Sequence, residues 1–164
     1  MAVIPVAEEA GVRIGLHPDD PPAHSLGGVA RIFRTASAYQ RAIDISGSEN
    51  FGLCFCVGTW AEGGKQLEKD VYEMIQTFGP RGRIFKVHFR NVDAPLPHFV
   101  ETFVDDGYMD MYKVMRELRA VGFNGVAIAD HIPTMVGGPR VSTAYTIGYM
   151  QALLRRANEE ATPQ

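Results

Sequence analysis

The sequence predicts an α/β protein with a parallel sheet, because β-rich and helical segments alternate along the chain. Short apolar runs are followed by amphipathic segments four times over its 164 residues, as in parallel strands joined by right-handed helical crossovers. The predicted strands are apolar along nearly their whole length, which is typical of strands covered on both faces. Two architectures fit this pattern: a flavodoxin-like open sheet, or half of a (β/α)8 barrel, which needs about 250 residues when complete.

The first unit runs from a helix to a strand and on to a second helix. Residues 3–11, VIPVAEEAG, predict the end of a helix closed by Gly11 in the C-cap position. Residues 12–17, VRIGLH, predict a short strand that stops at the proline-rich loop HPDDPP. Residues 35–46, TASAYQRAIDIS, predict a helix with Thr35 as its N-cap.

The second unit contains both cysteines of the chain. Residues 51–58, FGLCFCVG, predict the second strand, and residues 63–79, GGKQLEKDVYEMIQTFG, predict one amphipathic helix. The apolar stripe of that helix is Leu67, Val71, Met74, Ile75 and Phe78. Residues 83–91, RIFKVHFRN, predict the third strand, and a long loop follows as far as residue 107.

The last unit closes the pattern. We expect a helix over 109–122, MDMYKVMRELRAVG, a fourth strand over 123–131, FNGVAIADH, and a final helix over 143–160. Residues 1–160 are therefore predicted to form a single (β/α)4 domain, and 161–164 a frayed tail.

Composition excludes several classes of function. A net charge of -3 and the lack of a basic run argue against a nucleic-acid partner. No apolar run approaches the roughly 20 residues of a membrane span, and the acidic start does not resemble a signal peptide. Cys54 and Cys56 would lie about 6.6 Å apart on one face of a strand, which is a poor geometry for a disulfide between them. We therefore expect a cytoplasmic protein with free thiols.

Each predicted strand ends at one potential metal ligand, and these are His17, Cys56, His88 and Asp130. Any one of them could have a structural role: a turn cap, an inert thiol, a buried histidine or a paired carboxylate. The carboxyl ends of parallel strands share one edge of the sheet, however, and four such residues together favour a metal site. Cys54 lies deeper in its strand and is expected to pack. Imidazole and thiolate suit Zn2+ or Fe2+, whereas the carboxylate admits Mn2+.

Five segments together resemble the mannonate dehydratase family in order and spacing: LHPDDPP, GLCFCVG, KVHFRNV, ETFVDDGYMDMYKVMRELRAVGFNGV and ADH. The resemblance implies a TIM (β/α)8 barrel of the xylose-isomerase-like kind and a requirement for Mn2+ or Fe2+. It also implies a lyase activity, the dehydration of D-mannonate to 2-keto-3-deoxy-D-gluconate, a step of hexuronate (glucuronate) catabolism.

The resemblance also implies roles for single residues. It makes the four strand-end residues the metal ligands and His131 a catalytic residue. Tyr145 is the matching catalytic tyrosine, with Tyr149 as an alternative, and the acid and base roles stay open. Arg90 and Arg140 are candidates for pairing with the substrate carboxylate, against the alternative that both are solvated surface arginines.

The chain matches only the C-terminal half of such a barrel, and about four further βα units are expected before it. A four-stranded half-barrel exposes two sheet edges. We expect it to form a homo-oligomer or to bind a separate N-terminal half. Two other functions remain open: a related metal-dependent sugar isomerase or epimerase, and a non-catalytic metal-binding half-barrel.

Overall fold

Four parallel strands form the central sheet of the computed structural model, which describes residues 3–161. The sheet strands are β1 (Ile14–Leu16), β4 (Phe51–Cys56), β5 (Ile84–Phe89) and β8 (Val126–Ala129). Two small antiparallel hairpins pair β2 (Ser25–Leu26) with β3 (Val29–Ala30), and β6 (Asn91–Val92) with β7 (Glu101–Thr102). The helices are α1 (Val3–Glu9), α2 (Ala36–Ser46), α3 (Val57–Gly63), the 3-10 helix η1 (Gly64–Leu67), α4 (Val71–Phe78), α5 (Met111–Ala120) and α6 (Pro139–Ala161).

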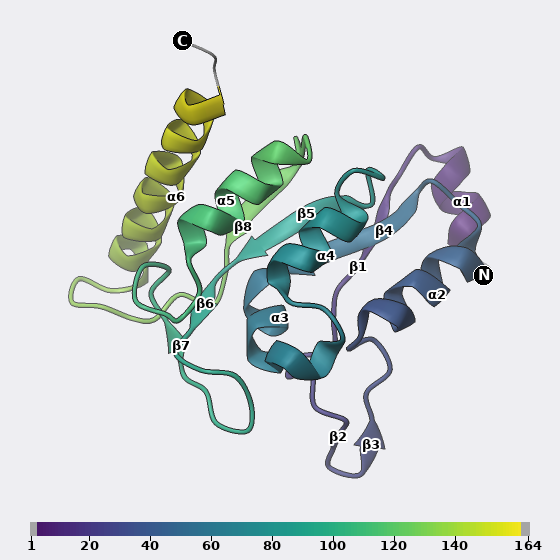
Figure 1. The fold of residues 1–164 in the computed structure, drawn as a ribbon, viewed down its shortest axis with the longest axis horizontal. Helices are drawn as coiled ribbons and strands as arrows, with labels where there is room; N and C mark the ends of the chain where they lie inside the picture. The colour runs from purple at the N-terminus through teal and green to yellow at the C-terminus, as the bar shows by residue number, and fades with distance from the viewer. Residues whose placement is uncertain (1–2, 162–164) are drawn as a thin grey trace.

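The strand order decides between the two architectures that the sequence allows. The strands lie side by side as β1-β4-β5-β8, so each parallel strand pairs with the next one along the chain. A flavodoxin-like sheet reverses its strand order, whereas a barrel keeps it sequential. Helices α2, α4, α5 and α6 follow one another in that same order (Figure 1). The fold is therefore that of half a (β/α)8 barrel.

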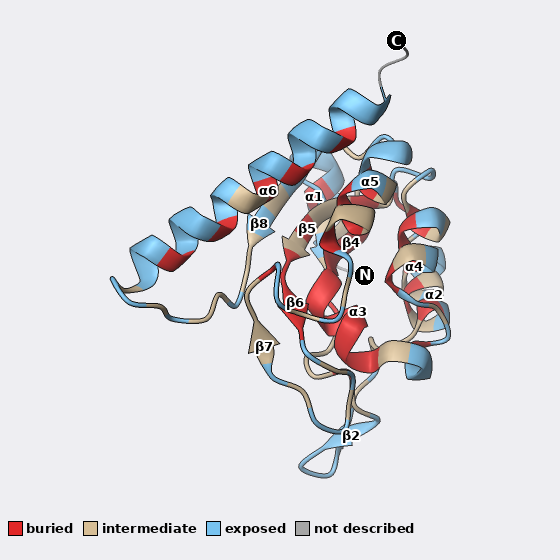
Figure 2. Cartoon of the chain, turned by 60° about the vertical axis from the view of Figure 1, so that its left-hand side comes forward, coloured by how far each residue is buried: buried red, intermediate tan, exposed pale blue. Residues whose placement is uncertain are grey.

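The hydrophobic core lies between the sheet and its helices. Alternate residues of β4 and β5, such as Phe55 and Val87, are buried in this core. The helix α3 is buried along its whole length (Figure 2), and its Trp60 packs edge-on against Tyr39 of α2. The stripe predicted for residues 63–79 is buried as expected.

The structure corrects the prediction of one helix over residues 63–79. The segment divides into η1 and α4, because Glu68, directly after η1, has a positive φ of 70° and Asp70 starts a new helix with a capping box. A separate helix, α3, begins directly after β4, and its N-cap is Cys56. The predicted second strand, residues 51–58, is therefore two residues too long, because Val57 and Gly58 belong to α3.

Most other predicted elements are present. Thr35 caps α2 by accepting a hydrogen bond from the amide of Ala38, and Gly11 follows α1 with a positive φ of 64°. The segment 91–107, predicted as a loop throughout, contains the β6–β7 hairpin. Of the predicted tail 161–164, Ala161 ends α6 and the remainder lies outside the described residues. None of the helices within residues 3–161 combines the length and the apolar content of a membrane span.

The capping box of α4 gives a test of this fold. Asp70 accepts from the amide of Glu73, and the Glu73 carboxylate accepts from the amide of Asp70. Asp70→Ala removes the cap and should lower the free energy of unfolding by about 1 kcal/mol in urea denaturation. Asp44→Ala is the control, because the exposed bond from Gln40 that it removes is worth at most about 0.5 kcal/mol. Equal losses in the two variants would contradict the assignment of this helix start.

Candidate metal and acid–base site

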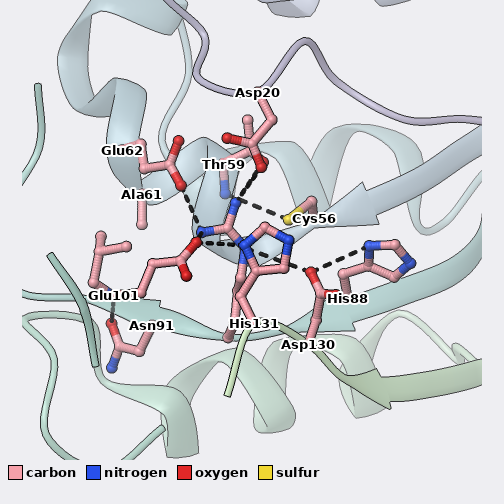
Figure 3. Close-up of polar contacts among 12 residues, drawn as sticks. Asp20, Cys56, Thr59, Ala61, Glu62, His88, Asn91, Glu101, Asp130 and His131 are labelled. Atoms are coloured by element: carbon pink, nitrogen blue, oxygen red, sulfur yellow. Dashed lines mark hydrogen bonds and ion pairs between the residues drawn. The ribbon is translucent and has the colours of Figure 1, made fainter. Parts of the chain in front are cut away.

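The strand ends bring the predicted ligands to one edge of the sheet. Cys56 and His88 are paired residues on the neighbouring strands β4 and β5. His17 directly follows β1, and Asp130 directly follows β8. Parallel pairing in sequential order therefore places all four side chains at the carboxyl edge, where Figure 3 shows Cys56, His88 and Asp130 together.

Three of these residues form a cluster that could hold a metal ion. The ligand atoms of His17, Cys56 and His88 all lie within 4.8 Å of one another. The Nε2 atom of His17 lies 3.2 Å from Nδ1 of His88, and the same Nδ1 atom lies 3.4 Å from a carboxylate oxygen of Asp130. Two imidazoles and a thiol at this spacing fit a divalent transition metal, and the Asp130 carboxylate lies beside one of the imidazoles.

Cys54 has a second role beside packing. Its thiol is buried, which raises its pKa, and its Sγ lies 3.4 Å from Nε2 of His88. That nitrogen is on the side of the ring opposite to the atom that faces His17. Contacts of this kind fix the orientation of a ligating imidazole. Both cysteines are free thiols.

Arg90 is buried and does not lie on the surface as a solvated arginine would. Its side chain is 1% exposed and forms ion pairs with Asp20 and Glu62, each at 2.5 Å, and with Glu101 at 3.1 Å. Its Nε atom lies 3.5 Å from Asp130. Figure 3 shows the carboxylates of Asp20, Glu62 and Glu101 pointing into the same small region of the site. The interpretation of Arg90 as a solvated surface arginine is therefore wrong, whereas its pairing with a substrate carboxylate stays a prediction.

The close approach of Arg90 depends on a glycine in α3. A Cβ atom on Gly58 would lie 2.4 Å from Cγ of Arg90, so only glycine leaves room for this side chain. Thr59, the next residue, accepts a hydrogen bond from Arg90 at 3.1 Å and donates one to Asp20 at 3.3 Å. Asp20, in the proline-rich loop after β1, is thus part of the network around Arg90.

His131 adopts an unusual backbone conformation and has one strong partner. Its φ of 42° is in the left-handed region, which non-glycine residues rarely occupy outside functional or strained positions. Its Nδ1 atom contacts the Oε1 atom of Glu101 in β7. The sequence pattern does not point to Glu101, because the two residues meet only through the β6–β7 hairpin.

The predicted tyrosine is held by the loop that follows β7. Tyr145 in α6 donates a hydrogen bond to Asp105, which raises the pKa of the phenol to about 12. Its ring packs edge-on against Phe103 with the ring centroids 5.6 Å apart. Burial raises the pKa of Tyr149 as well. Arg140 is exposed in the first turn of α6.

The fold is half a (β/α)8 barrel, and its strand ends carry three residues that could hold a metal ion. The family model for D-mannonate dehydratase (UxuA) matches residues 1–157. The chain therefore belongs to the mannonate dehydratase family, as its motifs indicate.

Individual mannonate dehydratases also match this chain, each over part of its own length. The chain is 38% identical over 136 residues to a mannonate dehydratase of Oceanobacillus iheyensis, covering 79% of this chain and 36% of that protein. It is 33% identical to mannonate dehydratase 2 of Halalkalibacterium halodurans, covering 93% of this chain and 43% of the relative. The chain thus spans less than half the length of these curated relatives.

Solved structures confirm the half-barrel. The mannonate dehydratase of Streptococcus suis serotype 2 superposes with a TM-score of 0.87 at 33% identity, over 99% of this chain and 49% of that one. An L-ribulose 3-epimerase superposes with a TM-score of 0.69 at 20% identity, over 98% of this chain and 53% of that one. The second likeness concerns the fold alone, which is that of xylose-isomerase-like barrels.

The contacts of the two thiols give a test of the metal cluster. Cys56→Ala removes the thiol of the candidate cluster and should weaken Co2+ binding at least about tenfold, whereas Cys54→Ala should have a smaller effect. Because a thiolate bound to Co2+ absorbs in the near ultraviolet, that band should disappear in Cys56→Ala and persist in Cys54→Ala. Loss of the band in Cys54→Ala alone would reverse the assignment.

The buried carboxyl of Glu62 gives a test of the Arg90 network. Burial raises its pKa to about 7, although the nearby Arg90 opposes this shift. Because the folded-state pKa of Glu62 lies above the ordinary 4.5, its carboxyl group contributes its full stabilisation below pH 4.5. That contribution is lost as the pH rises through about 7. Between about pH 5 and 8 the free energy of unfolding of the parent should therefore fall relative to Glu62→Gln. A constant difference in urea titrations across this range would contradict the shift.

Proposed function

We propose that this chain carries the metal-binding and acid–base half of an enzyme that dehydrates D-mannonate to 2-keto-3-deoxy-D-gluconate in hexuronate catabolism. One observation carries the proposal: in a member of this family, His17, Cys56 and His88 cluster within 4.8 Å and Asp130–His131 lies at the same edge. The two free thiols suit a reducing compartment, so we place the activity in the cytoplasm.

We propose Mn2+ or Fe2+ as the metal, held by His17, Cys56, His88 and Asp130. The Asp130 contact to His88 supports the fourth position. A divalent ion there would stabilise the negative charge that develops beside the substrate carboxylate when the C2 proton leaves. The contact between Cys54 and His88 keeps the imidazole in place for this role.

Dehydration requires two proton transfers, and the two residues proposed for them have different partners. His131 has Nδ1 against Glu101, so its Nε2 atom is the one left to take the C2 proton. Tyr145 is protonated at neutral pH, since its pKa is raised to about 12 by the bond to Asp105. We therefore propose His131 as the base and Tyr145 as the acid that protonates the departing C3 hydroxyl. Tyr149 is the alternative to Tyr145.

Arg140 is the first candidate for pairing with the substrate carboxylate. It is exposed, and it lies on the same helix as Tyr145. The charge of Arg90 is compensated by its carboxylate partners. We accordingly propose this role for Arg140, with Arg90 as the alternative.

We also propose that residues 1–160 act as one half-barrel unit and that a second half closes the barrel. Among the described strands, β1 and β8 each have a single neighbour, and Val126 of β8 is 63% exposed. The Streptococcus suis mannonate dehydratase is about twice as long as the region matched here. We propose the first half of such a barrel as the partner, with a second copy of this chain as the alternative.

The test is an anaerobic assay with Mn2+ or Fe2+ that follows the 2-keto-3-deoxy acid formed from D-mannonate. The chain would be assayed alone and mixed with the first half of the Oceanobacillus iheyensis relative, and the mass in solution would show whether the chain pairs with itself. Turnover in either sample supports the proposal. Metal binding without turnover in both would favour the non-catalytic half-barrel, and epimerised or isomerised sugar would favour the isomerase alternative.

The same assay tests the residues. His131→Asn should lower kcat by about 10²- to 10⁴-fold, because it removes a general base. Cys56→Ser should lower turnover by weakening metal binding. His98→Asn is the matched control, since His98 is exposed on the loop between β6 and β7, outside the proposed site. Parent-like rates in His131→Asn or Cys56→Ser would refute the site assignment.

A further inference from the structure

We propose that Glu101 is the positioning residue of His131: it keeps the imidazole proton on Nδ1 and so leaves Nε2 free to accept a proton from the substrate. This inference rests on the proposed function for its consequence in catalysis. The contact between Glu101 and His131 is independent of that function.

One oxygen atom of Glu101 has two partners. The Oε1 atom accepts from Nη1 of Arg90 at 3.1 Å and also contacts Nδ1 of His131. The Arg90 side chain is 1% exposed and is held in turn by Asp20 and Glu62. The carboxylate is therefore fixed from the protein side by a buried cation that cannot move away.

The backbone that carries Glu101 is also fixed. Glu101 pairs with Val92 in the β6–β7 hairpin, and its neighbour Thr102 pairs with Asn91. The buried amide of Asn91 donates to the carbonyl oxygens of Val104 and Met109, at 3.2 and 3.1 Å. The pairing of the hairpin therefore fixes the backbone position of Glu101, which an unpaired loop would leave free to vary.

A neutral imidazole carries its proton on one of two nitrogens, and the partner of one nitrogen decides the role of the other. An ionised carboxylate accepts hydrogen bonds and donates none, so at Nδ1 it selects the Nδ1–H form. The His131 side chain is 47% exposed, so the rest of the ring faces open space. The left-handed backbone at this residue sets the direction of the ring, and Glu101 sets its tautomer.

Arg90 does not depend on Glu101 to compensate its charge. Arg90 already has two carboxylate partners at 2.5 Å, and the Glu101 side chain is 37% exposed. Replacing Glu101 should thus leave the fold and the metal ligands in place while releasing His131.

The test measures the imidazole nitrogens directly, by 15N NMR of the whole chain labelled at histidine. The signals of His131 are identified by their absence in His131→Gln. In the parent we expect a protonated Nδ1 and an unprotonated Nε2. In Glu101→Ala we expect a mixture of tautomers, with Co2+ affinity unchanged. Thr102→Ala changes the other residue of β7 and should keep the parent tautomer.

The kinetic consequence separates this inference from the proposed function. In a sample that turns over D-mannonate, Glu101→Ala should lower kcat at least about tenfold with little change in KM, and Glu101→Asp should restore part of the loss. If the parent does not turn over D-mannonate, the NMR measurement of the His131 tautomer still tests the role of Glu101. An unchanged tautomer in Glu101→Ala would overturn the proposal. Should that variant fail to fold, Glu101→Leu keeps much of the side-chain volume, accepts no hydrogen bond and gives the same readout.

Discussion

The ion pairs of the buried Arg90 guanidinium are the interaction on which the rest of the site depends. A cation that is 1% exposed is stable only where charged partners compensate for its lost hydration. Its partners are Asp20 after β1, Glu62 in α3, Glu101 in β7 and, at longer range, Asp130 after β8. Segments far apart in the sequence are thereby held against one side chain. The segments after β1 and β8 and the β6–β7 hairpin, which carry residues of the candidate site, are linked to one another in this way.

The turn from β4 into α3 serves both the core and the site. Cys56 ends the strand, offers its sulfur to the metal cluster and accepts from the amide of Thr59 as the N-cap of α3. Gly58, two residues after Cys56, leaves the space that the Arg90 side chain fills. This explains why the helix is buried throughout, and why small residues stand where a surface helix would carry polar ones.

The sequence predicts the parts of the site that depend on strand position alone. His17, Cys56, His88 and Asp130 follow from the rule that parallel strands present their carboxyl ends on one edge, and the sequential strand order agrees with the family resemblance. The environment of Arg90 could not be predicted in this way. An arginine that ends a strand is usually solvated, and only the three-dimensional arrangement shows its carboxylate partners.

The metal cluster draws its three donors from three different strand ends, so an unfolded chain has no such arrangement to offer an ion. Any ion that binds there would favour the folded chain, by about 2.7 kcal/mol when its free concentration is 100 times its dissociation constant. The share of chains that stay folded in the cell, and escape proteolysis, would then rise and fall with the supply of the metal.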